Sequence, residues 1–143
     1  MIASTGVDII STVRVHRLIR KYGARFLERW FTPQEIAYCS KKQNPYIHYA
    51  ARLAAKEATM KALRIRWNHS MCLLDISVVN ADSGEPSIIL RRQALQVSTF
   101  LGITALHLSL SHCAEYAIAS VIAEVTCNEE GGILHLKLPE LPQ

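Results

Sequence analysis

Two acidic residues in this sequence stand in apolar surroundings, and both have the chemistry to hold a metal ion. Asp8 lies between Val7 and Ile9 in a run of β-forming residues, and Glu57 lies in an alanine-rich stretch. A carboxylate is costly to bury unless it is paired or bound to a metal. Two carboxylates brought together suit Mg²⁺, which completes its coordination with water and with phosphate oxygens. Lys61, one helical turn after Glu57, would then neutralise phosphate charge.

On the residues alone, this set indicates phosphoryl-type chemistry on a diphosphate substrate. A plainer interpretation stays open for each residue. Asp8 could face solvent on an alternating strand, and Glu57 and Lys61 could form an exposed pair worth a few tenths of a kcal/mol. The sequence does not show that the two carboxylates meet.

The stretch over 50–63 is the element on which these residues depend. It holds six alanines and two leucines, has no Gly or Pro, and contains one β-branched residue, so it is predicted to be helical. Asn44 and Pro45 can begin this helix as N-cap and first helical residue. Its end is expected near 63–66, and a polar loop is expected over 67–71.

The other elements follow from hydrophobic periodicity and from turn residues. We expect a strand over 2–10, an amphipathic helix over 12–22 that ends at Gly23, and a helix from the Thr32–Glu35 capping box to about Ser40. Further strands are expected over 73–79, 87–90, 105–111 and 116–125, a helix over 91–101, and a hairpin turn over 111–115 that carries His112. This order predicts an α+β domain in which an antiparallel sheet packs with a long central helix.

The net charge indicates which kinds of partner the protein could bind, and the cysteines indicate the cellular compartment. The 143 residues carry a formal net charge of +4, and the pI of about 9.0 favours an acidic partner, which could be a nucleic acid, a phosphate-bearing cofactor or an acidic protein. The four cysteines are scattered, which is typical of free thiols in a reducing cytoplasm. No leader peptide is expected, and no apolar run is long enough to span a bilayer, so no membrane partner is expected.

Seven segments together resemble one family. They are G-V-D-I-I at 6–10, R-F-L-E-R-W-F-T-P-Q-E at 25–35, A-R-L-A-A-K-E-A-T-M-K-A-L at 51–63, D-I-S-V-V at 75–79, S-G-E-P at 83–86, L-S-L-S-H at 108–112 and Y-A-I-A-S-V-I at 116–122. In this order and spacing they resemble the bacterial holo-[acyl-carrier-protein] synthases, the small 4′-phosphopantetheinyl transferases. The resemblance covers about 2–125 and implies that family's fold. The rest, 126–143, is expected to be a C-terminal extension.

The resemblance implies a reaction and a set of roles. The family moves the 4′-phosphopantetheine arm of coenzyme A (CoA) onto a serine of apo acyl carrier protein, in fatty acid biosynthesis, and releases adenosine 3′,5′-bisphosphate. By resemblance, Mg²⁺ would be held by Asp8 and Glu57, and Glu57 or a metal-bound water would be the base. CoA would be held by Arg52, Lys61, Gly84, Pro86, Ser111 and His112, with Lys61 stabilising the leaving group. The carrier protein would be bound by Arg14, Arg17, Lys21 and Arg25. The family assembles as a homotrimer with active sites between subunits.

One departure concerns the loop after the central helix. Where the family has a glycine-rich turn, this sequence has R-I-R-W-N at 64–68, so arginine side chains could replace backbone contacts to phosphate, or the loop could lie elsewhere. Two alternatives stay open, and the loop departure supports only the second of them. A basic nucleic-acid-binding domain would use the cationic and aromatic residues over 25–31, but it would leave Asp8 and Glu57 without a role. A catalytically silent homolog would keep the fold as an interaction module.

Overall fold

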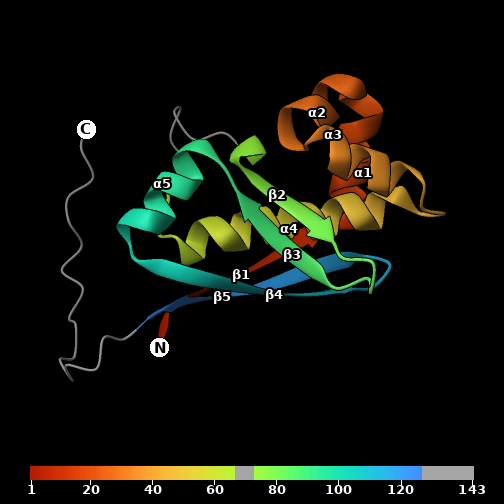
Figure 1. Cartoon of the computed structure of the whole chain (residues 1–143). Coiled ribbons are helices and arrows are strands. Elements are labelled where there is room, and N and C mark those ends of the chain that lie inside the picture. The colour runs from red at the N-terminus through yellow and green to blue at the C-terminus, as the bar shows by residue number, and fades with distance from the viewer. Residues whose placement is uncertain (67–72, 127–143) are drawn as a thin grey trace.

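The computed structural model describes residues 1–66 and 73–126, and these ranges form two antiparallel sheets and five α-helices (Figure 1). The strands are β1 (Ile2–Ser11), β2 (Ile76–Asn80), β3 (Pro86–Leu90), β4 (Ile103–His112) and β5 (Tyr116–Val125). The helices are α1 (Thr12–Tyr22), α2 (Ala24–Trp30), α3 (Pro33–Ser40), α4 (Pro45–Ala62) and α5 (Arg92–Phe100), and a short 3₁₀ helix covers Leu73–Asp75. The expected polar loop and nearly all of the expected extension lie outside the described residues.

The long helix α4 is the centre of the fold. The β1-β5-β4 sheet lies along one side of it and the β2-β3 hairpin lies on the other (Figure 1). Most of α4 from Tyr49 onward is buried. Alanines let the sheet approach closely, and Ala54, Ala55 and Ala58 pack in one cluster with buried residues of β5. The predicted α+β class, with an antiparallel sheet on a long helix, is confirmed.

Gly6 fixes how β1 sits on α4. A Cβ atom at this position would lie 1.9 Å from the carbonyl oxygen of Ala58 and 2.8 Å from the amide nitrogen of Ala62. Backbone meets backbone here, so there is no side chain that could move aside. Because Asp8 follows two residues later and faces the same side of the strand, this contact also sets its distance from the helix.

The structure differs from the sequence expectation in several features, besides shifts of one or two residues at the ends of elements. A helix that was not expected, α2, forms over Ala24–Trp30. Leu73–Asp75 forms a 3₁₀ turn before the strand expected over 73–79, and the buried Asp75 there accepts from Arg92 at 2.6 Å. Asn44 precedes α4 without a side-chain capping hydrogen bond. His112 belongs to the end of β4, so the hairpin turn is shorter than 111–115.

A buried ion pair ties α3 to α4. Lys56 Nζ lies 2.8 Å from Glu35 Oε2, and both side chains are fully buried. Glu35 also accepts from the backbone amides of Thr32, at 2.8 Å, and Val78, at 3.0 Å, while Lys56 donates to the carbonyl of Leu73. The expected capping box is therefore formed, and its glutamate has a second role as the partner of a buried lysine.

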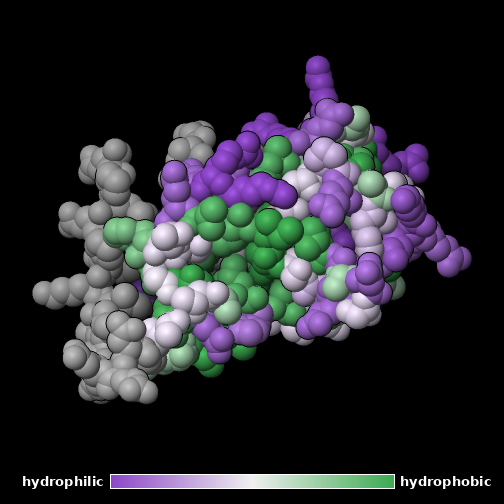
Figure 2. Space-filling view, in the orientation of Figure 1, coloured by the Kyte–Doolittle hydropathy of each residue, from purple (hydrophilic) through white to green (hydrophobic). Residues whose placement is uncertain are grey.

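The outer face of the sheet carries exposed apolar side chains. Val7, Ile9, Tyr116 and Ile118 all point away from α4, and each is between 40% and 60% exposed. On another face, hydrophobic residues gather around β3 and β4 within a hydrophilic rim, and much of the surface over α1 to α3 is hydrophilic (Figure 2). Within 1–66 and 73–126, no helix is both long and apolar enough to cross a membrane.

Candidate active site

Asp8 and Lys61 form the first contact of the candidate site. Asp8 stands opposite the buried Ala119 of β5, so its side chain points toward α4 and is only 12% exposed. Lys61 Nζ lies 2.7 Å from Asp8 Oδ1 and 2.8 Å from the carbonyl oxygen of Val7. The interpretation of Asp8 as a solvent-facing strand residue is therefore wrong. The ion pair that forms joins Lys61 to Asp8 across two elements, while Glu57 is not part of it.

Glu57 lies within electrostatic reach of Asp8. Burial raises the pKa of Glu57, and the negative charge of Asp8 raises it further. The positive charges of Lys61 and Arg14 oppose these effects but do not cancel them. Because Glu57 responds to Asp8, to Lys61 and to a residue at the start of α1, the fold gathers these groups at one edge of the sheet.

Two features of this edge suit a divalent cation. Asp8 Oδ2 is buried and has no hydrogen-bond partner, which is costly for a carboxylate oxygen without a ligand. Like-charged carboxylates held near each other are stabilised by a cation between them. Within the described ranges no group of three or more His, Cys, Asp or Glu side chains could hold a metal. Two carboxylates match Mg²⁺, which fills its other positions with oxygens from water and substrate.

A second group of candidate residues surrounds Tyr38, and we call Lys42, His48, Arg52 and His112 the basic cluster. Arg52 stacks over the Tyr38 ring at 4.0 Å, and Lys42 lies 4.4 Å from the same ring. The ring centroids of His48 and His112 are 5.8 Å apart, and those of His48 and Tyr38 are 6.2 Å apart. Four basic side chains from α4, from β4 and from the segment before α4 thus converge on one site.

The turn before β3 is joined to this cluster through Asn80. Arg52 Nη2 donates to Asn80 Oδ1 at 2.6 Å, and Asn80 Nδ2 donates to the carbonyl of Gly84 at 2.9 Å. Pro86 pairs with Asn80 in the β2-β3 register. Gly84 and Pro86 are therefore held at the edge of the basic cluster. Ser111 is not, because it stands opposite Ile118 on the outer face of the sheet, whereas His112 stands opposite the buried Ala117.

Sequence reasoning missed His48, which was given no role among the candidate residues. It lies four residues before Arg52, so the two share a face of α4. Burial lowers the pKa of His48, and the positive charges of Lys42, His112 and Arg52 lower it further. The helical spacing was the available signal, while the approach of His112 from β4 depends on the tertiary fold.

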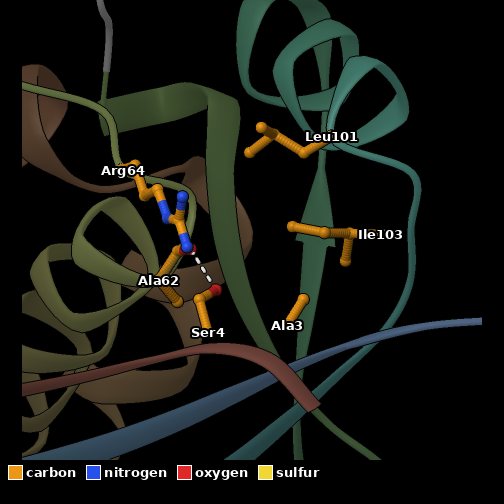
Figure 3. Close-up of a pocket in the computed structure, with 6 residues that line it drawn as sticks. All are labelled: Ala3, Ser4, Ala62, Arg64, Leu101 and Ile103. Atoms are coloured by element: carbon orange, nitrogen blue, oxygen red, sulfur yellow. Dashed lines mark hydrogen bonds between the residues drawn. The ribbon is translucent and has the colours of Figure 1, made fainter. Parts of the chain in front are cut away.

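The segment after α4 is the one in which this sequence lacks the glycine-rich turn of the family. Arg64 has φ of 57°, in the left-handed region that glycine adopts more easily. Its side chain points toward Ser4 and Ala62 at a small pocket that is also lined by Ala3, Leu101 and Ile103 (Figure 3). Ser4 Oγ donates to the carbonyl of Ala62 at 2.5 Å there. Arg64 therefore adopts a backbone conformation that glycine would adopt more easily.

The basic residues of α1 and α2 form an exposed surface, of which Arg14 lies near Glu57. Arg14, Arg17, Lys21 and Arg25 are all exposed. Val15 and Thr12 are the buried residues of α1, so that helix packs through its apolar stripe. The Arg14 charge acts on Glu57, which links this surface to the carboxylate pair.

This fold matches that of a known class of enzyme. The family model of the 4′-phosphopantetheinyl transferase superfamily matches residues 4–121, and the chain belongs to that superfamily. The chain is 42% identical to a holo-[acyl-carrier-protein] synthase of Solibacter usitatus over 124 residues, which cover 87% of this chain and 99% of the relative. Within the superfamily it belongs to the holo-[acyl-carrier-protein] synthases.

Solved structures show the same fold. A crystal structure of holo-[acyl-carrier-protein] synthase from Neisseria meningitidis superimposes with a TM-score of 0.78 at 32% identity, covering 87% of this chain and 99% of that one. The Helicobacter pylori enzyme, solved in complex with coenzyme A, superimposes with a TM-score of 0.74 at 32% identity over 84% of this chain and 99% of that one. The predicted family and its fold are thereby confirmed.

Proposed function

We propose that the chain transfers 4′-phosphopantetheine from CoA to a serine of apo acyl carrier protein. The observation that carries this proposal is the convergence of Asp8, Glu57 and Lys61 in a chain of the holo-[acyl-carrier-protein] synthase family. The serine oxygen forms a bond to the phosphorus that bears pantetheine. The bond from that phosphorus to the bridging oxygen breaks, and adenosine 3′,5′-bisphosphate leaves.

Mg²⁺ would be held by Asp8 and Glu57 and would neutralise the diphosphate charge when bound. Lys61 then leaves Asp8 and donates to the oxygen that gains charge on the leaving group. Its exposure of 54% and its long side chain allow this movement. Either Glu57 or a water molecule held beside the carboxylates would receive the serine proton.

The active site would be completed by a second copy of the chain. Nine residues separate Arg52 from Lys61, which puts the two on opposite sides of α4. Lys61 contacts β1, whereas Arg52 contacts β2. Because α4 is buried between them, one CoA molecule that meets both groups takes the carboxylates from one chain and the basic cluster from its neighbour.

The exposed apolar face of the sheet supports self-association, and we propose a homotrimer. Val7, Ile9, Tyr116 and Ile118 would be buried between copies, because a patch of this kind on a soluble monomer marks an interface. Ile118→Asp should yield monomers in analytical ultracentrifugation. A monomeric wild type with full activity would contradict the composite site.

The carrier protein would dock on α1 and α2, with acidic groups facing Arg14, Arg17, Lys21 and Arg25. All four are exposed, and the Arg14 charge acts on Glu57, so a carrier bound to them would have its serine near the carboxylates. Such a surface accelerates association and makes it salt-dependent. Charge reversal at Arg17 should raise KM for the carrier much more than KM for CoA.

The decisive experiment is mass spectrometry of apo acyl carrier protein after incubation with the chain, CoA and Mg²⁺. We expect a mass gain of one phosphopantetheine group, which disappears with EDTA and with Glu57→Ala. If a folded chain leaves several different carriers unmodified, the enzymatic proposal fails.

A further inference from the structure

The basic cluster holds more positive charge than the protein itself balances. In the stretches 1–66 and 73–126, no carboxylate forms an ion pair with Lys42, His48, Arg52 or His112. Arg52 is 3% exposed, and its Nε has no hydrogen-bond partner. A buried guanidinium nitrogen without a partner is unfavourable, so the cluster is suited to receive an anion.

One phosphate group of CoA takes no part in the transfer reaction, and it is the group available to bind the basic cluster. CoA carries a diphosphate, which reacts, and a phosphate monoester on its ribose. In the proposed function, the diphosphate binds beside the carboxylates and Lys61. The phosphate monoester is then the remaining anionic group that can bind the basic cluster. With three free oxygens, it can accept hydrogen bonds from several donors at once.

We propose that His48 is a binding residue for this phosphate monoester and that it takes up a proton when CoA binds. This inference rests on the proposed function and adds a proton to its binding step. His48 is a half-buried member of the cluster at the junction of α4 and β4, where its ring meets His112 at 5.8 Å between centroids. The two rings are in edge contact at this distance, so a phosphate would lie beside them, where it can reach both.

Every charged neighbour of His48 favours the neutral ring while the site is empty. Lys42 approaches from the segment before α4, Arg52 from the next turn of α4 and His112 from β4, while Tyr38 of α3 contributes a neutral ring. All three charged groups repel an imidazolium, and partial burial acts in the same direction. A phosphate dianion reverses the local charge, so the imidazolium becomes the favoured form and donates to the phosphate.

The coupling between proton uptake and binding determines whether the affinity for CoA rises or falls with pH. A group that binds a proton in the complex but not in the free protein makes binding tighter as pH falls, by at most about tenfold per pH unit. The second pKa of a phosphate monoester is about 6, so near pH 7.5 the free ligand is already a dianion. Proton uptake measured there belongs to the protein.

The test is isothermal titration calorimetry at pH 7.5 in two buffers of different ionisation enthalpy. CoA is compared with 3′-dephospho-CoA, both in saturating Mg²⁺, so that protons exchanged at the carboxylates cancel. We expect net proton uptake with CoA, and less with 3′-dephospho-CoA. CoA should bind more tightly at pH 6.5 than at pH 7.5.

The variant His48→Phe keeps an aromatic ring but has no proton to gain, and His48→Gln is a second variant should phenylalanine disturb the fold. Both should lose most of the excess uptake and bind CoA more weakly, with the affinity for 3′-dephospho-CoA unchanged. His16→Phe is the matched control, because His16 is also half-buried and stacks on a tyrosine, Tyr46, at 3.9 Å.

The outcomes separate this inference from the proposed function. CoA binding with no excess uptake, or with the same uptake in His48→Phe as in wild type, overturns the role of His48 and leaves the transferase proposal standing. An absence of any CoA binding by the folded chain overturns both. Loss of the excess uptake in both His48 variants, with the His16 control unchanged, supports the proton-coupled phosphate site.

Discussion

Lys61 and Asp8 are held together by an ion pair of 2.7 Å that joins the last turn of α4 to the first strand. The same ammonium donates to the carbonyl of Val7. The residue expected to serve the leaving group therefore occupies one carboxylate oxygen of the expected metal site. In the proposed function, the metal and Lys61 compete for Asp8, and the release of Lys61 accompanies the binding of metal and substrate.

This competition predicts opposite effects of Lys61→Met on metal binding and on turnover. Mg²⁺ should bind the free protein more tightly, because no ammonium then occupies Asp8. Turnover should fall by about 100-fold, a typical loss when one charge-stabilising donor is removed. Calorimetry with Mg²⁺ and a steady-state assay measure the two effects. Equal or weaker Mg²⁺ binding would contradict the competition.

Glu57 predicts a pH-dependent stability in the absence of metal. Its pKa in the folded chain is raised, so its contribution to stability is greatest at low pH and is lost as pH rises through the folded-state pKa. Glu57→Gln should therefore stabilise the metal-free protein at pH 7.5, and this gain should shrink toward pH 4. Thermal unfolding with EDTA across this range measures the difference. A gain that is the same at every pH would argue against a desolvated Glu57.

Gly6→Ala should strongly destabilise the fold. The added methyl group would lie 1.9 Å from the Ala58 carbonyl, so β1 or α4 must move, at a cost of at least about 1–3 kcal/mol. Gly102→Ala is the control, because there only a left-handed φ of 67° opposes alanine and no atom lies within 4 Å. Urea unfolding should show the larger loss at Gly6. Because Asp8 shares the displaced strand, Mg²⁺ binding should weaken as well.

The buried pair of Glu35 and Lys56 predicts a non-additive double mutant. Lys56→Met alone leaves a buried carboxylate without its cation and should cost about 3–5 kcal/mol. Adding Glu35→Gln removes the negative charge and keeps one acceptor oxygen, which serves either the Thr32 or the Val78 amide, so it should restore part of the loss. A double-mutant cycle from denaturant unfolding measures this coupling, and strictly additive losses would contradict it.

The backbone conformation of Arg64 leads us to expect different stabilities for the glycine and alanine variants at this position. Both substitutions remove the guanidinium, but only glycine adopts a φ of 57° without a steric cost. Arg64→Gly should therefore be more stable than Arg64→Ala by about 1 kcal/mol. A change in CoA affinity common to both variants would come from the lost side chain, whereas a change in only one would come from the backbone.

The sequence by itself determined the elements and the family of this protein. The amphipathic pattern of α1, the Thr32–Glu35 capping box and the alanine-rich stretch of α4 are local patterns, and each helix formed where it was predicted because its cause lies within a few residues. Tyr22 is the exception within α1, since it is half exposed and not part of the buried stripe. Helix α2 was missed because seven residues with cationic and aromatic side chains carry no clear helical period. The identification as a holo-[acyl-carrier-protein] synthase followed from motifs spread along the chain.

Only the tertiary structure decided which candidate residues share a site. Asp8 and Lys61 are 53 residues apart and meet because Gly6 lets β1 lie against α4. The side-chain alternation of β4 separates Ser111 from His112, although the two are adjacent and were predicted to act together. His48 is part of the basic cluster because its ring contacts that of His112, which lies in β4, far along the chain. Such contacts depend on strand register and helix rotation, which are set by packing between distant segments and not by local sequence.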